Sequence, residues 1–314
     1  MAASRVLFVF LDGVGVGADD PSINPLAAAD APALLDILEG RKAVSDSFSF
    51  VGARASAVAL DATLGIPGLP QSGTGQIALL TGLNAAERFG RHFGPYAPTT
   101  LRSMVQQESL LARTVRAGRK VTFANGYPAD LIAMAEDSGR RPLPLRAAIT
   151  IAALGAGVLS RHEADIISGN AVASEITHDS WRRFGTRPEI PAIAPVQAGR
   201  NLARIANSHD LTLFAHYATD SAGHLKDLSA GIAAWQLVDE FIGAVVSSLD
   251  DDVLLIVASD HGNLEDARTQ HTRNPALCIL VGPGHQTLAR ELRALTDVTP
   301  ALLGLLTNRG CRPA

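Results

Sequence analysis

One stretch near the C-terminal end constrains the fold more than any other. Residues 253–258 (VLLIVA) form an unbroken apolar run, and Ser259-Asp260-His261-Gly262-Asn263 follow directly. A short run without polar alternation predicts a strand buried on both faces, as in the parallel sheets of α/β proteins. Such sheets place their ligand sites just beyond the carboxyl ends of the strands. The stretch therefore predicts an α/β fold with an acid and an imidazole at that edge.

Two further predicted strands end in the same way. Residues 5–11 (RVLFVFL) lead into Asp12 and a glycine-rich turn, and residues 211–217 (LTLFAHY) lead to Asp220 and His224. His271 follows Asp260 after a loop long enough to fold back toward it. Aspartate and histidine side chains suit a divalent metal such as manganese or zinc. Each of these clusters taken alone could be an ordinary polar strand end that binds no ligand. Because all of them are expected at the same edge of the sheet, a metal site is favoured.

The glycine-rich turn after Asp12 also suggests dinucleotide binding. An acid at its first position would repel a pyrophosphate, and no acidic strand end follows about twenty residues later. A dinucleotide site is therefore disfavoured.

A second glycine-rich loop, residues 65–76, leads into an apolar run that predicts a helix. Ser72 lies just before the expected helix N-terminus, where free N–H groups and the helix dipole favour a phosphate or an alkoxide. An ordinary helix cap is the alternative. Thr74 is a second candidate hydroxyl in the same loop.

Composition narrows the classes of partner. The 314 residues carry a formal net charge of -4, so no basic field would attract nucleic acid or an anionic membrane. The two cysteines, Cys278 and Cys311, form no disulfide framework. No segment has the pattern of a signal peptide or a membrane span. We expect a cytoplasmic protein without nucleic-acid or membrane partners.

Other periodic segments complete the α/β pattern. Further strands are expected at residues 53–62, 120–124 and 276–281, and helices at 31–40, 100–117, 145–160, 195–208 and 301–306, with a long amphipathic helix after His224. Residues 162–194 are irregular and lack the pattern of a strand followed by an acid. We interpret this middle region as part of an insert.

Taken together, the motifs resemble the alkaline phosphatase superfamily, most closely its cofactor-independent phosphoglycerate mutase and phosphopentomutase branch. The matching pieces are Asp12-Gly13, Ser72 within PQSGTGQ, the Asp220 to His224 segment, Asp260-His261-Gly262-Asn263, and His271-Thr272-Arg273-Asn274-Pro275. Residues 297–303 resemble the last core helix of that superfamily. The motifs occur in the family's order from one end of the chain to the other.

The resemblance implies a mostly parallel central sheet flanked by helices, with a small inserted α+β cap. The core would comprise residues 1–90 and 196–314, and the cap residues 91–195. It also implies two divalent metal ions, manganese or zinc, with magnesium possible. One would be held by Asp220, His224 and His271, and the other by Asp12, Asp260 and His261. Ser72 would contact both as the nucleophile.

The implied activity is phosphoryl transfer from a small phosphorylated metabolite through a phosphoserine at Ser72. The acceptor, either water or a substrate hydroxyl, distinguishes a phosphomonoester hydrolase from a phosphomutase. The chain departs from the mutases at Gln76, where they usually carry histidine, and in its short cap. Candidate substrate-binding residues are Arg91, His92 and Asn125, with Arg88, Arg140 and Arg141 as further cations; solvated surface polarity is the alternative for each.

Two other functions remain open at this point. One is a phosphodiesterase or phosphonate-cleaving enzyme of the same superfamily. The other is a catalytically silent, metal-stabilised binding protein.

Overall fold

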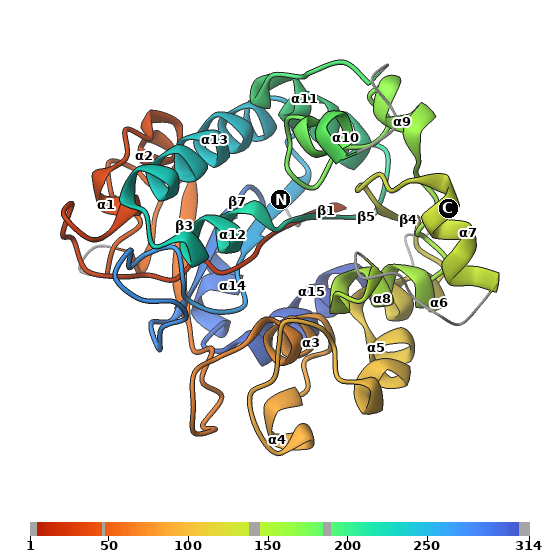
Figure 1. Cartoon of the computed structure of the whole chain (residues 1–314), viewed down its shortest axis with the longest axis horizontal. Helices are drawn as coiled ribbons and strands as arrows, with labels where there is room; N and C mark the ends of the chain where they lie inside the picture. The colour runs from red at the N-terminus through yellow and green to blue at the C-terminus, as the bar shows by residue number, and fades with distance from the viewer. Residues whose placement is uncertain (1–4, 46–47, 138–144, 185–189, 308–314) are drawn as a thin grey trace.

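The computed structural model describes residues 5–45, 48–137, 145–184 and 190–307, and is built on one seven-stranded sheet. The strands lie in the order β2-β3-β7-β6-β1-β5-β4 (Figure 1). Their bounds are Arg5–Leu11 for β1, Phe50–Val51 for β2, Ala55–Leu60 for β3, Val121–Phe123 for β4, Leu211–His216 for β5, Val253–Ala258 for β6 and Ala276–Val281 for β7. The strands expected from the apolar runs are confirmed.

The sheet is mixed, which corrects the expectation of a mostly parallel one. Strands β4, β5, β1 and β6 run parallel to one another. Strand β7 is antiparallel to both β6 and β3, and β2 is antiparallel to β3. Parallel neighbours need a crossover, usually a helix. No helix lies between β6 and β7, and the loop that joins them returns the chain in the opposite direction.

Helices cover both faces of the sheet, so the molecule has three layers (Figure 1). One layer contains α1 (Pro25–Ala28), α2 (Pro32–Ile37), α11 (Pro195–Ala206) and α13 (Leu228–Val246). The other contains α3 (Ser72–Thr81), α5 (Arg102–Glu108), α6 (Leu110–Arg116), α8 (Ala148–Gly155), α14 (His285–Glu291) and α15 (Leu295–Thr307). The shorter helices are α4 (Ala85–Phe89), α7 (Ala129–Asp137), α9 (Glu163–Ile167), α10 (Asp179–Phe184) and α12 (Ala218–Leu225), with a 3-10 turn at Thr99–Leu101.

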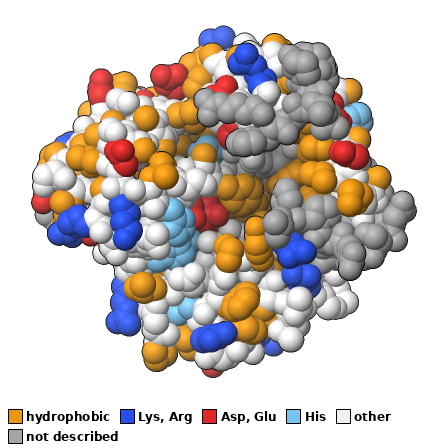
Figure 2. Space-filling view, viewed as in Figure 1, with side chains coloured by type: hydrophobic (Ala, Val, Ile, Leu, Met, Phe, Trp, Pro, Cys, Tyr) orange, Lys and Arg blue, Asp and Glu red, His pale blue; other side chains and the backbone are white. Residues whose placement is uncertain are grey.

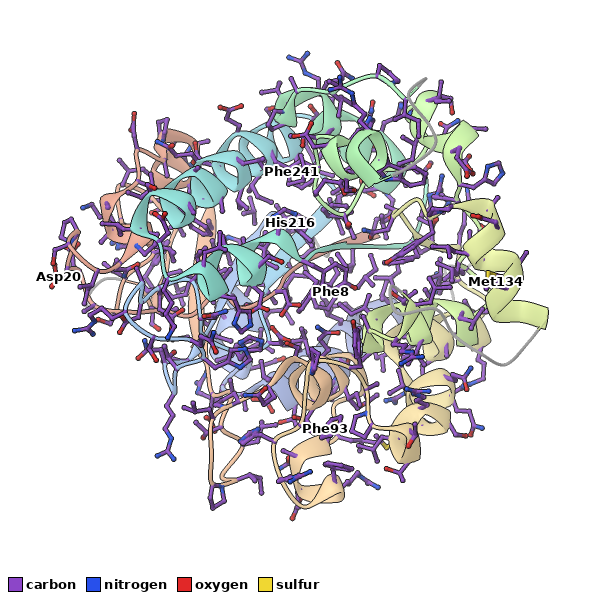
Figure 3. All side chains as sticks on the ribbon, in the orientation of Figure 1. Phe8, Asp20, Phe93, Met134, His216 and Phe241 are labelled. Carbon is purple, nitrogen blue, oxygen red and sulfur yellow. The ribbon has the colours of Figure 1, made fainter. Side chains whose placement is uncertain are left out.

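The central strand β1 explains why both faces are covered. Its alternate side chains Val6, Phe8 and Phe10 join one hydrophobic cluster, and Leu7, Val9 and Leu11 join the other. Successive side chains of a strand point to opposite faces. In Figure 3, Phe8 belongs to the cluster beneath the sheet and Phe241 of α13 to the cluster above it.

Helix α13 is long and apolar enough to cross a membrane by length and composition alone. In this fold its apolar face packs against the sheet, where Trp235, Val238 and Ile242 are buried. The predicted amphipathic helix is thus a core helix.

The expected cap is not shown as a separate unit in the described part of the chain. β4, from within residues 91–195, is the strand that pairs with β5 at one edge of the central sheet. Helices α5, α6 and α8 contribute to the same hydrophobic cluster as α3 and α15. Only a small cluster around Ile166 and Trp181 is distinct. The boundaries at residues 90 and 195 stay a prediction.

Several helices differ from their predicted extent. The helices expected over residues 31–40 and 145–160 are shorter, at Pro32–Ile37 and Ala148–Gly155. The helix expected over residues 100–117 breaks at Ser109, whose hydroxyl accepts the Ala112 N–H and caps α6. The last helix begins at Leu295 rather than Ala301 and contains Pro300. Its start is fixed by Asp297, whose carboxylate accepts the N–H groups of Arg293 and Ala294.

His216, the last residue of β5, is buried on the α13 side of the sheet (Figure 3). Its Nδ1 lies 2.7 Å from the Ser174 carbonyl oxygen, and its Nε2 is buried without a partner among the described residues. Burial lowers the pKa of His216 to about 4. The folded protein therefore holds a neutral imidazole at this position.

This burial predicts an acid-dependent loss of stability. The unfolded chain takes up a proton near pH 6.5, whereas folded His216 does so only near its pKa of about 4, so the free energy of unfolding falls between these values by up to about 3 kcal/mol. In His216→Asn an amide can keep the hydrogen bond to Ser174 but cannot titrate. We expect urea denaturation to show a smaller loss between pH 6.5 and pH 4.5 in the variant. An equal loss in both proteins would contradict the assignment.

Candidate metal centre

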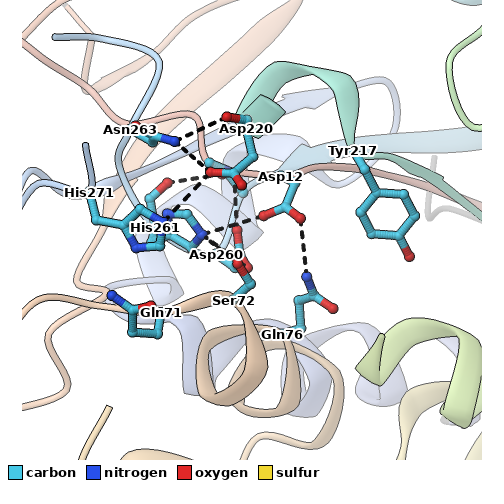
Figure 4. A network of polar contacts seen from close by, with 12 residues as sticks. Asp12, Gln71, Ser72, Gln76, Tyr217, Asp220, Asp260, His261, Asn263 and His271 are labelled. Atoms are coloured by element: carbon cyan, nitrogen blue, oxygen red, sulfur yellow. Dashed lines mark hydrogen bonds and ion pairs between the residues drawn. The ribbon is translucent and has the colours of Figure 1, made fainter. Parts of the chain in front are cut away.

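The carboxyl ends of the parallel strands bring the predicted ligands together (Figure 4). Asp12 follows β1, Asp260 and His261 follow β6, and Asp220 and His224 lie on α12 directly after β5. His271 comes from the loop that leads back into β7, and Ser72 is the first residue of α3. The single edge expected from the sequence thus exists.

One group of potential ligands comprises Asp220, His224 and His271, whose ligand atoms lie within 4.8 Å of one another. Asp220 and His224 are four residues apart on α12, so they share a helix face, and Asp220 Oδ2 lies 3.2 Å from His224 Nε2. His271 Nδ1 is 2.8 Å from the Pro70 carbonyl oxygen. Because that contact requires a protonated Nδ1, the Nε2 lone pair of His271 points into the group.

A second group comprises Asp12, Asp220 and His261, again within 4.8 Å. His261 Nε2 lies 3.4 Å from Asp12 Oδ1 and 3.8 Å from Asp260 Oδ2. Asp260 therefore lies beside the second group, and its role as a ligand stays a prediction. Asp220 contributes to both groups.

The electrostatics of the second group fit a bound cation. Asp12 Oδ1 and Asp260 Oδ2 are buried without hydrogen-bond partners in the described structure. Burial raises the pKa of both carboxyl groups, and for Asp260 the neighbouring Asp12 raises it further. Ionised carboxylates here need a positive charge close by.

The histidines fit the same conclusion. Burial alone would lower the pKa of His261, but Asp260 and Asp12 outweigh it and raise the pKa to about 10. A proton on His261 would thus supply a positive charge next to the Asp12 and Asp260 carboxylates. Burial and the neighbouring His261 lower the pKa of His271 to about 4, so His271 is neutral, the form that binds metals. The carboxylate and imidazole donors suit manganese or zinc, and the carboxylates also suit magnesium.

Ser72 lies against this centre. Its Oγ is 2.9 Å from His261 Nε2, and only 4% of the residue is exposed. Gly75 lets the first turn of α3 approach the second group closely, since a Cβ there would lie 2.7 Å from the Asp260 carbonyl oxygen. Thr74, the alternative hydroxyl, instead accepts the Phe93 N–H at 3.1 Å and is absent from the polar network of the centre. The structure brings Ser72, not Thr74, to the metal ligands.

The predicted substrate-binding residues are not brought to the centre. Asn125 is buried, and its amide donates to the Ala215 carbonyl and accepts the Ala215 N–H at 2.7 and 2.8 Å. It thus extends the sheet, and its role in substrate binding stays a prediction. His92 Nε2 lies 3.2 Å from the Ile66 carbonyl, and Arg91 is exposed with its guanidinium over Phe89. Arg140 and Arg141 lie outside the described residues.

Sequence reasoning missed Glu265, a buried carboxylate behind the centre. Its Oε2 accepts the N–H groups of Gly15 and Asn263 at 2.9 and 2.8 Å. Its Oε1 accepts from the Thr272 hydroxyl and from Asn274 Nδ2. Glu265 thus ties together the loops that carry Asp12, His261 and His271. The three glycines at positions 15, 17 and 262, each of which would clash with Glu265 if it had a Cβ, were the available signal.

A cavity of about 320 Å³ opens beside Ser72. Its described lining consists of Asp12, Ser72, Gln76, Pro95, Tyr96, Tyr127, Ala147, Ser174, Tyr217, Asp220 and Ser221. Figure 2 shows a hollow on this face, with histidine and acidic side chains near one edge and hydrophobic side chains beside it. The metal centre therefore adjoins a space large enough for a small ligand.

Comparison with known proteins identifies the family. The profile of the Metalloenzyme superfamily matches residues 4–308. The chain belongs to the Metalloenzyme superfamily. Its overall fold is similar to a protein of Pyrococcus horikoshii (TM-score 0.57, 12% identity, 100% of both chains) and to the alkaline phosphatase of the Antarctic bacterium TAB5 (TM-score 0.51, 12% identity, 98% and 99% of the two chains). The resemblance to the alkaline phosphatase superfamily is thereby confirmed.

Among curated proteins, this Metalloenzyme superfamily member is similar to 2,3-bisphosphoglycerate-independent phosphoglycerate mutases. It is 34% identical over 132 residues to that of Ruegeria sp. (strain TM1040), which covers 39% of this chain and 26% of the relative. It is 36% identical over 132 residues to that of Syntrophotalea carbinolica, covering 39% and 25%. The match spans about a quarter of the length of these relatives.

The metal centre predicts that divalent cations stabilise the folded protein. At a free metal concentration of 100 times Kd, binding to the folded state alone adds about 2.7 kcal/mol. Manganese or zinc should therefore raise Tm and be found in the protein by elemental analysis. His271→Ala removes a ligand and should lower metal content and the Tm rise, whereas His92→Ala, outside both groups, should not. Equal behaviour of the two variants would contradict the assigned site.

Glu265 generates a separate prediction. In Glu265→Gln, an amide NH₂ replaces one acceptor oxygen and leaves buried donors unpaired. The free energy of unfolding should fall by about 2–4 kcal/mol, measured by urea denaturation. Glu87→Gln, at an exposed position in α4, serves as the control and should change it by less than about 0.5 kcal/mol. If the Glu265 variant is as stable as the control, the four hydrogen bonds of Glu265 make no net contribution to the free energy of unfolding.

Proposed function

We propose that this Metalloenzyme superfamily member transfers the phosphoryl group of a small phosphate monoester, with Ser72 as nucleophile. The observation that carries the proposal is the place of the Ser72 hydroxyl, 2.9 Å from His261 Nε2 and next to the two groups of Asp and His ligands. At Ser72 a candidate nucleophile, the candidate metal ligands and the cavity are next to one another.

The first turn of α3 supports the role of Ser72. Ser72 is the first residue of a ten-residue helix, where unpaired N–H groups and the positive end of the dipole favour negative charge. That charge would be carried by the ionised serine and by the phosphate. Divalent cations, held by Asp12, Asp260 and His261 on one side and by Asp220, His224 and His271 on the other, would supply further positive charge that favours the alkoxide and the phosphate.

The proposed reaction then has two steps. The Ser72 hydroxyl gives up its proton, its oxygen forms a bond to phosphorus, the ester P–O bond breaks, and the leaving alkoxide takes up a proton. A second oxygen, from water or from a hydroxyl, later loses its proton and attacks the phosphoserine; the P–O bond to Ser72 breaks, and the released serine oxygen takes up a proton. In the metal-free protein His261 Nε2 holds the Ser72 hydroxyl in a hydrogen bond, so the oxygen is already directed toward the centre.

The comparisons give this proposal further support. The curated relatives are phosphoglycerate mutases, and the shared fold includes an alkaline phosphatase. Both names describe chemistry at phosphate esters. Hydrolysis and intramolecular transfer differ only in the acceptor of the second step.

The test is phosphate release from para-nitrophenyl phosphate with added manganese. Ser72→Ala should lower kcat/KM by at least about 10³-fold, because the nucleophile is gone. Thr74→Val is the matched control: it removes the neighbouring hydroxyl and should retain activity once folding is verified by circular dichroism. Radiolabelled phosphate should be trapped on wild type but not on Ser72→Ala.

Which variant loses phosphatase activity decides whether Ser72 is the nucleophile. Activity that survives in Ser72→Ala and disappears in Thr74→Val would reject Ser72 as nucleophile. Release from bis-para-nitrophenyl phosphate that exceeds release from the monoester would favour a phosphodiesterase instead.

A further inference from the structure

The described lining of the cavity beside Ser72 falls into two chemical classes. One comprises the candidate metal ligands Asp12 and Asp220, together with Ser72. The other contains all three tyrosines of the chain, Tyr96, Tyr127 and Tyr217, with Pro95 and Ala147. If phosphate binds at the candidate ligands and Ser72, the leaving group of the ester contacts this second class of lining residues.

This second class of lining residues carries no positive charge in the described part of the chain. Among the described lining residues the charged side chains are Asp12 and Asp220, and both belong to the candidate metal centre. A carboxylate or second phosphate on the leaving group would be taken out of water without a cation to pair with. Burying an unpaired charge is costly, so the lining selects against an anionic leaving group.

Besides Asp12 Oδ1, two polar atoms of the cavity lining have no partner within hydrogen-bond distance in the described structure. Gln76 Oε1 and the Tyr217 hydroxyl are both buried and make no hydrogen bond. Buried polar groups are almost always paired, so such atoms mark places where a ligand group would complete the bonding. A carbonyl oxygen can accept, and a phenol can both donate and accept, which together suits a hydroxyl group.

The orientation of both groups is fixed by the protein. Gln76 Nε2 donates to Asp12 Oδ2 at 3.4 Å; the reverse orientation would place the amide oxygen against the carboxylate. The Tyr217 ring packs edge-on against Phe10, with centroids 6.1 Å apart. In Figure 4, Gln76 and Tyr217 lie on the side of Asp12 away from the histidines. Tyr127, by contrast, has its hydroxyl 3.2 Å from Thr150 Oγ1.

We propose that the leaving group is a small uncharged alcohol with at least one further hydroxyl, recognised by Gln76 Oε1 and the Tyr217 hydroxyl. The substrate class is thus the monophosphate of a neutral polyol or sugar rather than a phosphorylated carboxylic acid. This inference rests on the proposed phosphoryl-transfer function and specifies its substrate. It differs from phosphoglycerate, the compound in the names of the curated relatives.

The experiment uses a matched pair of ligands. Glycerol 3-phosphate and 3-phosphoglycerate differ in a CH₂OH group against a carboxylate. Their binding to manganese-loaded Ser72→Ala, which cannot turn them over, is measured by calorimetry. We expect glycerol 3-phosphate to bind at least tenfold more tightly. Equal or tighter binding of 3-phosphoglycerate, or no binding of either, would overturn the inference.

A second comparison tests the contacting residue. Tyr217→Phe in the same background should weaken glycerol 3-phosphate about tenfold but leave phenyl phosphate, which has no further hydroxyl, unchanged. Tyr127→Phe, whose hydroxyl is already bonded to Thr150, should leave the ratio of the two ligands unchanged. Equal weakening of both ligands by Tyr217→Phe would indicate a merely structural tyrosine and overturn the assigned contact.

Turnover by wild type separates the two proposals. Binding that prefers glycerol 3-phosphate, with neither phosphate release nor a trapped phosphoserine from any ester, would reject the proposed activity while supporting the neutral binding pocket. Release from glycerol 3-phosphate and 3-phosphoglycerate with equal kcat/KM would support the activity and overturn the inference.

Discussion

The structure depends on buried negative charge at the carboxyl edge of its sheet. Asp12 and Asp260 follow neighbouring strands, and the pairing of Phe10 with Ala258 places the two carboxyl groups side by side. Buried carboxylates at this spacing repel each other, so a proton or a cation must lie between them. Asp260 and Asp12 raise the pKa of His261 to about 10, which favours a positive charge on that imidazole. The same buried negative charge suits a divalent cation.

A rigid support keeps these charges together. Glu265 binds three loops with hydrogen bonds from neutral donors, and Asn263 Nδ2 donates to Asp220 Oδ1 at 2.6 Å. Beneath them, β1 is covered on both faces by apolar side chains. Ligands on strand ends and on a short helix are thus positioned by packed elements rather than by free loops, which favours a preorganised centre.

The ligand cluster was predictable from the sequence because Asp12, Asp220 and Asp260 each follow an apolar run closely, and strand ends of parallel neighbours meet. Strand direction was not, because β7 follows β6 without a helix and only the pairing shows its reversal. The pairing of the Asn125 amide with Ala215 of the neighbouring strand could not be predicted, because it depends on how the two segments lie in the folded chain. Glu265 was missed because the amino-acid composition does not show which acidic side chains are buried. The roles of Gln76 and Tyr217 depend on which atoms lack partners, which requires coordinates.

The position of β1 has a consequence for how the chain folds during synthesis. Of the seven strands this one is made first, yet its two neighbours are β5 and β6, more than two hundred positions later, and Val6 pairs with both Leu211 and Leu254. The apolar centre of the sheet therefore cannot close until β5 and β6 have left the ribosome. Such non-local pairing is slow and exposes apolar strand edges in the meantime. Nascent chains that stop before β6 would carry an unpaired core strand and be prone to aggregation.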